Sequence, residues 1–234
     1  MPMDDGLIDD FLHRLKVEKN YSKHTLRGYS ADLNAYAEFL EERDRTIPEA
    51  SVRDVRGFLA MLRARGLARS TIARKVSAIR SLYKFLYRQG TIGENPAAAL
   101  RTPRQEKKLP QFLTVSEIER LMEAPDTSSW TGARDRAMLE TIYGGGLRVG
   151  ELVGLNDGDV DVSSGMARVR GKGKKERLAP IGPCAAECIR NYRRMRAEIE
   201  LRKKDPHALF LNAVDGRRLS ARSVRRVLRK WLLK

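Results

Sequence analysis

A glycine-rich segment, residues 144–155, carries an arginine suited to binding an anion. It reads Gly-Gly-Gly-Leu-Arg-Val-Gly-Glu-Leu-Val-Gly-Leu, so Glu151 follows Arg148 by one helical turn. The glycines predict a tight entry into a helix whose first turn holds Arg148, and a helix N-terminus favours anions. A guanidinium can grip two phosphate oxygens and stays charged, which suits phosphoryl transfer. Arg148 is therefore a candidate catalytic cation and Glu151 its supporting carboxylate. The alternative is an ordinary surface Arg–Glu pair.

A second segment, residues 168–177, predicts a β-hairpin with a lysine-rich tip. It reads Arg-Val-Arg-Gly-Lys-Gly-Lys-Lys-Glu-Arg, with Lys172 between two glycines that let the tip approach another backbone closely. A lysine there can protonate the oxygen that leaves when a phosphodiester breaks, if nearby cations lower its usual pKa of about 10.4. Arg170, Lys174 and Lys175 would supply those cations. The alternative is a basic turn that binds phosphates only for affinity.

The charge balance predicts a polyanionic partner. The 234 residues include 46 lysines and arginines against 30 acidic residues, a formal net charge of +16. Because the basic residues recur along nearly every segment, they favour a broad surface that follows a phosphate backbone. A membrane-surface protein would concentrate lysines on one amphipathic helix, and a basic protein with no such partner is the other alternative. With no signal peptide and no long apolar run, we expect a cytoplasmic protein.

No cofactor is predicted. Cys184 and Cys188 are the only cysteines and the three histidines are scattered, so neither a disulfide framework nor a zinc site is expected. The hairpin is not a phosphate-binding P-loop, because Gly173 stands where that motif needs serine or threonine. Three alternating aspartates imitate a calcium loop, but Val162 takes the required glycine position.

Helical periodicity dominates the first hundred residues. Four helices are predicted. The first covers residues 7–15, and the second begins at a cap, Ser22, and ends at about residue 40. The third extends from near Pro48 to Gly66, and the fourth from Ser70 to Gly90. The second should turn Lys23, Arg27 and Asp32 outward, and the third should bury Val52 among its apolar residues. Four such helices with short loops predict a compact bundle over residues 1–100, because each apolar stripe must pack against another.

Composition then separates a linker from a second domain. Residues 101–110 combine prolines with basic residues and predict an extended linker, either a strap across phosphates or a solvated hinge. The second domain, residues 111–234, should open with a helix capped by Thr114 and contain a β-hairpin over residues 166–181. Four other helices are predicted in this domain. One extends from about Ser129 to the three glycines at residues 144–146, and the next begins just after them. The last two cover residues 185–200 and Ser220 to the end. The fold class is therefore mainly α, with a small antiparallel β-hairpin.

The two functional segments and the helical domain before them resemble Xer-type members of the tyrosine recombinase, or phage integrase, family. The matching motifs are Gly-Leu-Arg-Val-Gly-Glu-Leu at residues 146–152 and Gly-Lys-Gly-Lys-Lys-Glu-Arg at residues 171–177. The resemblance implies a SAM-like core-binding domain and a catalytic domain that cleaves and rejoins DNA through a 3′-phosphotyrosyl bond, without metal or nucleotide. Arg148 would be the first catalytic arginine, Lys172 the catalytic lysine and Glu151 its supporting carboxylate.

The resemblance also implies the DNA contacts and the partners. The second and fourth helices would clamp one side of double-stranded DNA, and four protomers, as a homo- or hetero-tetramer, would assemble on paired DNA sites. Chromosome dimer resolution is the usual Xer role, and phage or plasmid integration is an alternative. The candidate DNA-binding residues are Lys23, His24, Thr25, Arg27, Arg69, Ser70, Thr71 and Arg74 in the helices, with Lys174 and Lys175 in the hairpin.

The sequence departs from the family pattern after the hairpin. That pattern continues with a His-x-x-Arg helix, a further histidine or tryptophan and the nucleophilic tyrosine, and all seven tyrosines here precede that region. The last predicted helix also reaches Lys234 without a stop signal. We therefore expect a catalytic domain that is incomplete at its C-terminus and a chain that binds DNA without completing catalysis. The alternative is a non-enzymatic DNA-binding or regulatory protein that never held a complete site.

Overall fold

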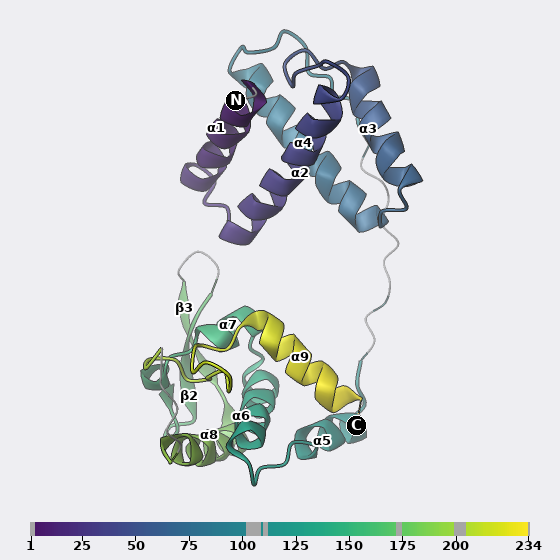
Figure 1. The fold of residues 1–234 in the computed structure, drawn as a ribbon. Helices are drawn as coiled ribbons and strands as arrows, with labels where there is room; N and C mark the ends of the chain where they lie inside the picture. Colours follow the sequence, from purple (N-terminus) through teal and green to yellow (C-terminus); the bar gives the residue numbers. More distant parts are fainter. Residues whose placement is uncertain (1–2, 102–108, 110–111, 172–174, 199–204, 234) are drawn as a thin grey trace. The chain divides into compact units, whose positions relative to one another are not determined.

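The computed structural model describes residues 3–101, 109, 112–171, 175–198 and 205–233. The chain divides into two compact units, Met1–Leu109 and Pro110–Lys234, which Figure 1 draws together. Both units are mainly helical and the second holds a small antiparallel sheet, so the predicted fold class is confirmed. Among the described helices, none combines the length and the apolar character that a membrane crossing requires.

The first unit is a bundle of amphipathic helices, as the sequence predicted. Its central contact joins α2 and α4, where the hydroxyls of Tyr36 and Tyr83 lie 2.8 Å apart and Tyr83 donates to the carbonyl of Ile47 at 3.0 Å. This contact satisfies both hydroxyls inside the apolar core, which burial otherwise makes costly. The helices of the unit are α1 (Met3–Val17), α2 (Lys23–Glu41), α3 (Val52–Ala64) and α4 (Arg69–Arg88).

The third helix begins later than predicted. Its cap is Ser51, whose hydroxyl accepts from the Asp54 N–H while the Asp54 carboxylate accepts from the Ser51 N–H. This reciprocal capping fixes the start of α3 at Val52, and Pro48 lies in the turn before it. The prediction that Val52 is buried was therefore wrong, because the first helical residue faces solvent.

Asp32 was predicted to face outward, and the structure shows that this was wrong. Its side chain is only 2% exposed, and it accepts from Lys75 Nζ at 3.1 Å and from the guanidinium of Arg74. Asp32 follows Tyr29 by three residues and precedes Tyr36 by four, so it lies on the buried stripe of α2. Two cations from α4 make this burial tolerable, since a buried charge needs partners.

The second unit packs helices around a three-stranded antiparallel sheet in the order β1-β2-β3. The predicted hairpin corresponds to β2 and β3, whereas the two residues of β1 were too short to predict. Its elements are α5 (Val115–Glu123), α6 (Trp130–Gly145), α7 (Val149–Gly154), the 3-10 helix η1 (Asp157–Asp159), β1 (Val160–Asp161), β2 (Met166–Arg170), β3 (Glu176–Pro180), α8 (Gly182–Ala197) and α9 (Ala221–Leu232).

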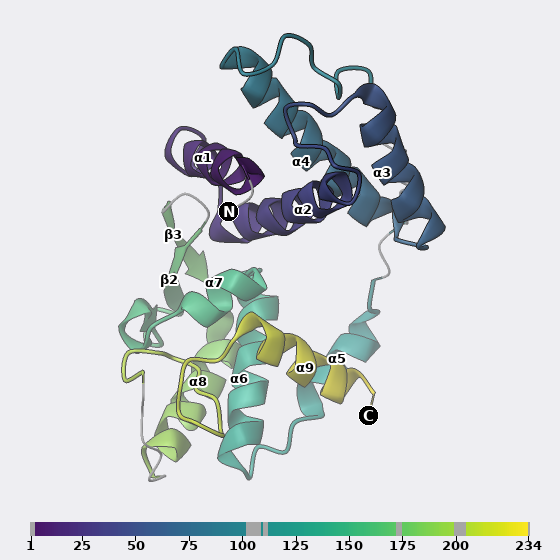
Figure 2. The ribbon, with the colours of Figure 1, turned by 45° about the horizontal axis from the view of Figure 1, so that its top comes forward.

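The glycine run at the end of α6 sets the position of α7. A β-carbon at Gly144 would lie 2.5 Å from the carbonyl oxygen of Ile181, so only glycine lets α6 approach the end of β3 this closely. Gly146 then takes a left-handed conformation with φ of +55° and ends the helix. Figures 1 and 2 show the result, with α7 lying between the β2–β3 hairpin and the start of α9.

Candidate active site

Arg148 stands at the N-terminal boundary of α7. It is the N-cap residue, with an extended backbone, one position before the first helical turn in which it was expected. Its side chain is 83% exposed, so the guanidinium is open to an incoming anion. A capping position normally belongs to serine, threonine, aspartate or asparagine, and the Arg148 side chain makes no such capping bond to α7.

Glu151 accepts from the backbone of Arg148 and also holds its guanidinium, and the sequence predicted only the second contact. Its carboxylate accepts from the backbone N–H of Arg148 at 3.0 Å through Oε2 and from Arg148 Nη1 at 3.0 Å through Oε1. The carboxylate is buried, with 5% of its side chain exposed. A buried carboxylate with fixed donors leaves Arg148 little freedom to change its position relative to α7.

Arg177 is a second cation on the same carboxylate, and sequence reasoning did not single it out. Its Nη2 donates to Glu151 Oε2 at 2.9 Å, and its side chain is 43% exposed. The signal lies in strand alternation, because Arg177 pairs with buried Val169 and stands two residues before buried Ala179. An arginine on the core-facing side of a strand needs a buried acid nearby, and Glu151 is that acid.

Glu151 is ionised at neutral pH. Burial raises the pKa of its carboxyl group, but the backbone and side-chain hydrogen bonds from Arg148 and the contact with Arg177 outweigh this effect. The net result is a pKa below the usual range of a glutamate. One negative charge therefore faces two guanidiniums, and the cluster keeps a net positive charge at its exposed edge.

The base of the hairpin lies beside this cluster. The backbone N–H of Gly171 donates to the carbonyl of Lys175 at 2.8 Å, and a β-carbon built at Gly171 would lie 3.6 Å from Glu151 Oε1. The residue that precedes Lys172 in the chain is thus next to the carboxylate that holds Arg148. Lys172 and Lys174 themselves fall outside the described residues, and Lys175 is exposed.

Arg170 does not contribute the free cation that was expected beside the hairpin tip. Its guanidinium donates to Glu176 at 2.9 Å and to Asp159 at 3.0 Å. Asp159 is buried and also accepts from Arg168 at 3.3 Å. These two arginines therefore face two carboxylates, one from η1 and one from β3, so their charges are balanced.

The candidate DNA-binding residues of the first unit lie in the N-terminal halves of α2 and α4. Arg74 links the two helices, because its Nη1 donates to the carbonyl of Gly28 at 3.1 Å as well as to Asp32. Thr25 is half-buried and its hydroxyl lies 2.9 Å from that of Ser22. The remaining candidates are exposed except for half-buried Thr71, namely Lys23, His24, Arg27, Arg69 and Ser70.

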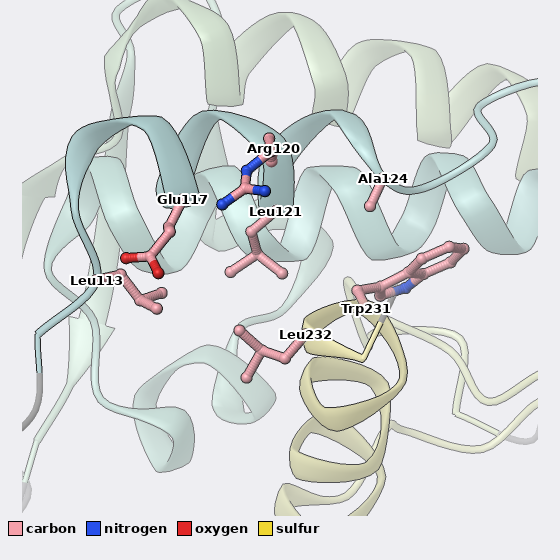
Figure 3. Close-up of a pocket in the computed structure, with 7 residues that line it drawn as sticks. All are labelled: Leu113, Glu117, Arg120, Leu121, Ala124, Trp231 and Leu232. Atoms are coloured by element: carbon pink, nitrogen blue, oxygen red, sulfur yellow. The ribbon is translucent and has the colours of Figure 1, made fainter.

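A groove elsewhere in the second unit does not include this site. Figure 3 shows it between α5 and the C-terminal end of α9, with Leu232 facing Leu121 and Trp231 near Ala124. Its lining combines apolar side chains with one acid and one base, namely Leu113, Glu117, Arg120, Leu121, Ala124, Trp231 and Leu232. None of these residues comes from α7 or from the hairpin, so the groove is a separate feature.

Comparison with protein families matches both units. Residues 8–90 match the model of the phage integrase N-terminal SAM-like domain, and residues 111–234 match the model of the phage integrase family. The second match contains the whole cluster of Arg148, Glu151 and Arg177. Together the two matches cover most of the chain.

Curated relatives agree with these matches. The chain is 45% identical to the tyrosine recombinase XerC of Pelotomaculum thermopropionicum, over 97% of this chain and 77% of the relative. It is 40% identical to the tyrosine recombinase XerC of Bacillus subtilis, over 93% of this chain and 72% of the relative. Both relatives therefore extend beyond the matched part.

Solved structures show the same fold at lower identity. A lambda integrase dimer bound to a COC′ core site aligns with a TM-score of 0.72 at 17% identity, covering 98% of this chain and 80% of the other. The XerH site-specific recombinase in a post-cleavage complex with palindromic difH aligns with a TM-score of 0.68 at 19% identity, covering 99% and 73%. The chain belongs to the phage integrase family of tyrosine recombinases, the enzymes that break and rejoin DNA.

Proposed function

We propose that this chain serves site-specific recombination of double-stranded DNA through a 3′-phosphotyrosyl intermediate, and that its biological task is the resolution of chromosome dimers. The observation that carries the chemical part is the 83% exposed guanidinium of Arg148 beside a buried carboxylate. Identity of 40 to 45% to XerC recombinases supports the biological part.

In this proposal Arg148 binds the phosphate that is cut. Attack on a phosphodiester adds negative charge to its oxygens, and a fixed guanidinium stabilises that charge without having to reorganise. Glu151 holds the guanidinium from the buried side, and Lys172 gives a proton to the departing 5′-oxygen. Lys174 and Lys175 add affinity for the backbone.

We also propose that these 234 residues bind DNA but do not form the phosphotyrosyl bond. Three of the seven tyrosines, Tyr36, Tyr83 and Tyr192, are buried. Burial raises the pKa of each of these hydroxyls, which opposes formation of the attacking phenolate. The other four stand before Arg148 in the chain, whereas the family places its nucleophile after the hairpin.

In this proposal the first unit makes most of the contacts with the DNA backbone that do not depend on base sequence. The N-terminal halves of α2 and α4 present exposed basic and hydroxyl side chains, which suit phosphate oxygens. Four protomers, of one or two kinds, would assemble on two DNA sites. A lambda integrase tetramer bound to a Holliday junction has the same fold at 18% identity.

A covalent-trapping experiment tests the proposal. Duplexes that the 234-residue chain enriches from a random library would define the site, and a nick placed near its cleavage position would make cleavage irreversible. We expect the protein expressed from the whole gene to form a covalent complex with this duplex, and the 234-residue chain to bind it without one.

Two results would contradict parts of the proposal. A covalent complex with the 234-residue chain would refute the claim that these residues cannot cleave, and replacing Tyr143 by phenylalanine would show whether this exposed tyrosine, five residues before Arg148 in the chain, is responsible. Absence of any covalent complex with the whole gene product would favour a non-enzymatic DNA-binding protein.

A further inference from the structure

The Glu151 cluster has more positive charge than its carboxylate can neutralise. Arg148 and Arg177 contact different edges of one carboxylate, through Oε1 at 3.0 Å and Oε2 at 2.9 Å. Glu151 is buried whereas both guanidiniums are open to solvent. Since each guanidinium carries five N–H donors and spends few of them on the carboxylate, both keep donors for an anion in solution.

Other clusters in the described part of the second unit lack this combination. Arg168 and Arg170 share buried Asp159, but Glu176 adds a second carboxylate and balances them. Arg193 and Arg196 share Asp157, but both also donate to backbone carbonyls, and Arg196 is buried. Excess positive charge on two solvent-exposed guanidiniums is thus found at Glu151 and not at these two other clusters.

We propose that Arg177 is a second phosphate-binding residue of the Arg148 site, and that the two guanidiniums clamp one DNA phosphate between them. This inference rests on the proposed function. Two guanidiniums on one carboxylate lie close enough together for the oxygens of a single phosphate to accept from both. An arginine suits this task because its planar donors match phosphate oxygens.

The charge balance explains why one arginine would not be enough. Paired only with Glu151, the guanidinium of Arg148 would be part of a neutral pair and would attract an anion weakly. Arg177 offsets the carboxylate, so the positive charge of Arg148 is available to the phosphate. Glu151 can then keep its role of fixing Arg148 without cancelling its charge.

Single-phosphate neutralisation tests the clamp with the 234-residue chain. The probes are duplexes of the selected site, each with one methylphosphonate, which replaces a charged phosphate oxygen by a methyl group. At one position we expect neutralisation to weaken wild-type binding by about tenfold or more, as for loss of a charge-assisted hydrogen bond. The same change should cost the Arg177→Gln and Arg148→Gln variants little, because the arginine left in each variant forms a neutral pair with Glu151 and binds the phosphate weakly.

Matched variants separate binding from folding. Arg168→Gln removes an arginine of similar exposure, 52%, from the neighbouring strand, and it should keep the wild-type response at that position. Arg177→Lys keeps the charge and should restore most of the response. It also preserves the test if Arg177→Gln does not fold, as judged by circular dichroism.

Two outcomes would overturn the inference in different ways. In the first, wild type binds the duplexes, but Arg177→Gln loses as much affinity as wild type at every neutralised phosphate, or is insensitive at a different phosphate from Arg148→Gln. Arg177 would then only anchor the hairpin to α7, and the proposed function would stand. If wild type bound no duplex, the proposed function would fail and the clamp with it.

Discussion

At the scale of single residues, the site depends on how a buried carboxylate presents a cation. Arg148 is the N-cap of a short helix and would be free to change rotamer without a partner. Glu151, three residues later, is buried and contacts both its backbone and its side chain. Local sequence spacing is enough to create this contact, because residues three apart on a helix are neighbours.

Replacing Arg148 by glutamine should separate cleavage from binding. In the protein expressed from the whole gene, single-turnover cleavage of a nicked duplex should fall by about a hundredfold or more, as for loss of a donor to a charged transition state. Affinity for the same duplex should fall by about tenfold or less, because one phosphate contact among many is lost. Equal losses in the two measurements would show that Arg148 only binds DNA.

Replacing Glu151 by glutamine should change the pH dependence of stability. The folded-state pKa of Glu151 is lowered, so its contribution is complete above the ordinary glutamate pKa of about 4.3 and is lost as pH falls through the lowered value. In urea unfolding at pH 7 we expect the variant to lose about 1–3 kcal/mol relative to wild type. That difference should shrink at pH 3, and a difference that stays constant with pH would contradict this account.

At the scale of elements, helix caps and apolar stripes set most boundaries, and one buried ion cluster joins two helices. Ser22, Ser51, Thr114, Ser129 and Ser220 each accept an N–H at the start of a helix. Four of these caps could be recognised from sequence. The prediction that Asp32 faces solvent was wrong, because its charge favours a surface position whereas its place on the apolar stripe of α2 requires burial.

Replacing Asp32 by alanine should destabilise the first unit. The change leaves Lys75, a largely buried cation, without its carboxylate and removes the ion pair of Arg74, whose contact with α2 is then reduced to its bond with the Gly28 carbonyl. Loss of one partner from a buried pair costs about 3–5 kcal/mol. Chemical denaturation followed by circular dichroism would measure this loss. Asp9→Ala, at an exposed position on α1, should change stability by about 0.5 kcal/mol or less.

At the scale of the whole molecule, the net charge of +16 favours binding to a polyanion such as DNA, and this binding should weaken as salt is added. On duplex DNA, the logarithm of the binding constant should fall with the logarithm of salt concentration, with a slope of about 0.9 per neutralised phosphate. Fluorescence anisotropy between about 50 and 200 mM salt would measure this slope. A binding constant that does not change with salt would contradict DNA binding through phosphates. On single-stranded DNA we expect the slope to be shallower than on duplex DNA.

The sequence by itself determined the features that depend on neighbours along the chain. Helical periodicity, capping residues, the hairpin around its glycines and the pairing of Arg148 with Glu151 all act over a few residues. The family motifs in the same segments also indicated the chemistry. The late start of α3 shows the limit of such reasoning, because Pro48 and Ser51 both suit a helix start and only the reciprocal bonds with Asp54 decide between them.

Only the tertiary structure decided which distant charges meet. Arg177 is 26 residues from Glu151, and Asp32 is 42 from Arg74. Whether such groups pair depends on how a strand packs against a helix, or one helix against another, and local periodicity contains no information about that packing. The balance of charge at each cluster, and with it the exposed positive edge at Arg148 and Arg177, is therefore a property of the folded unit.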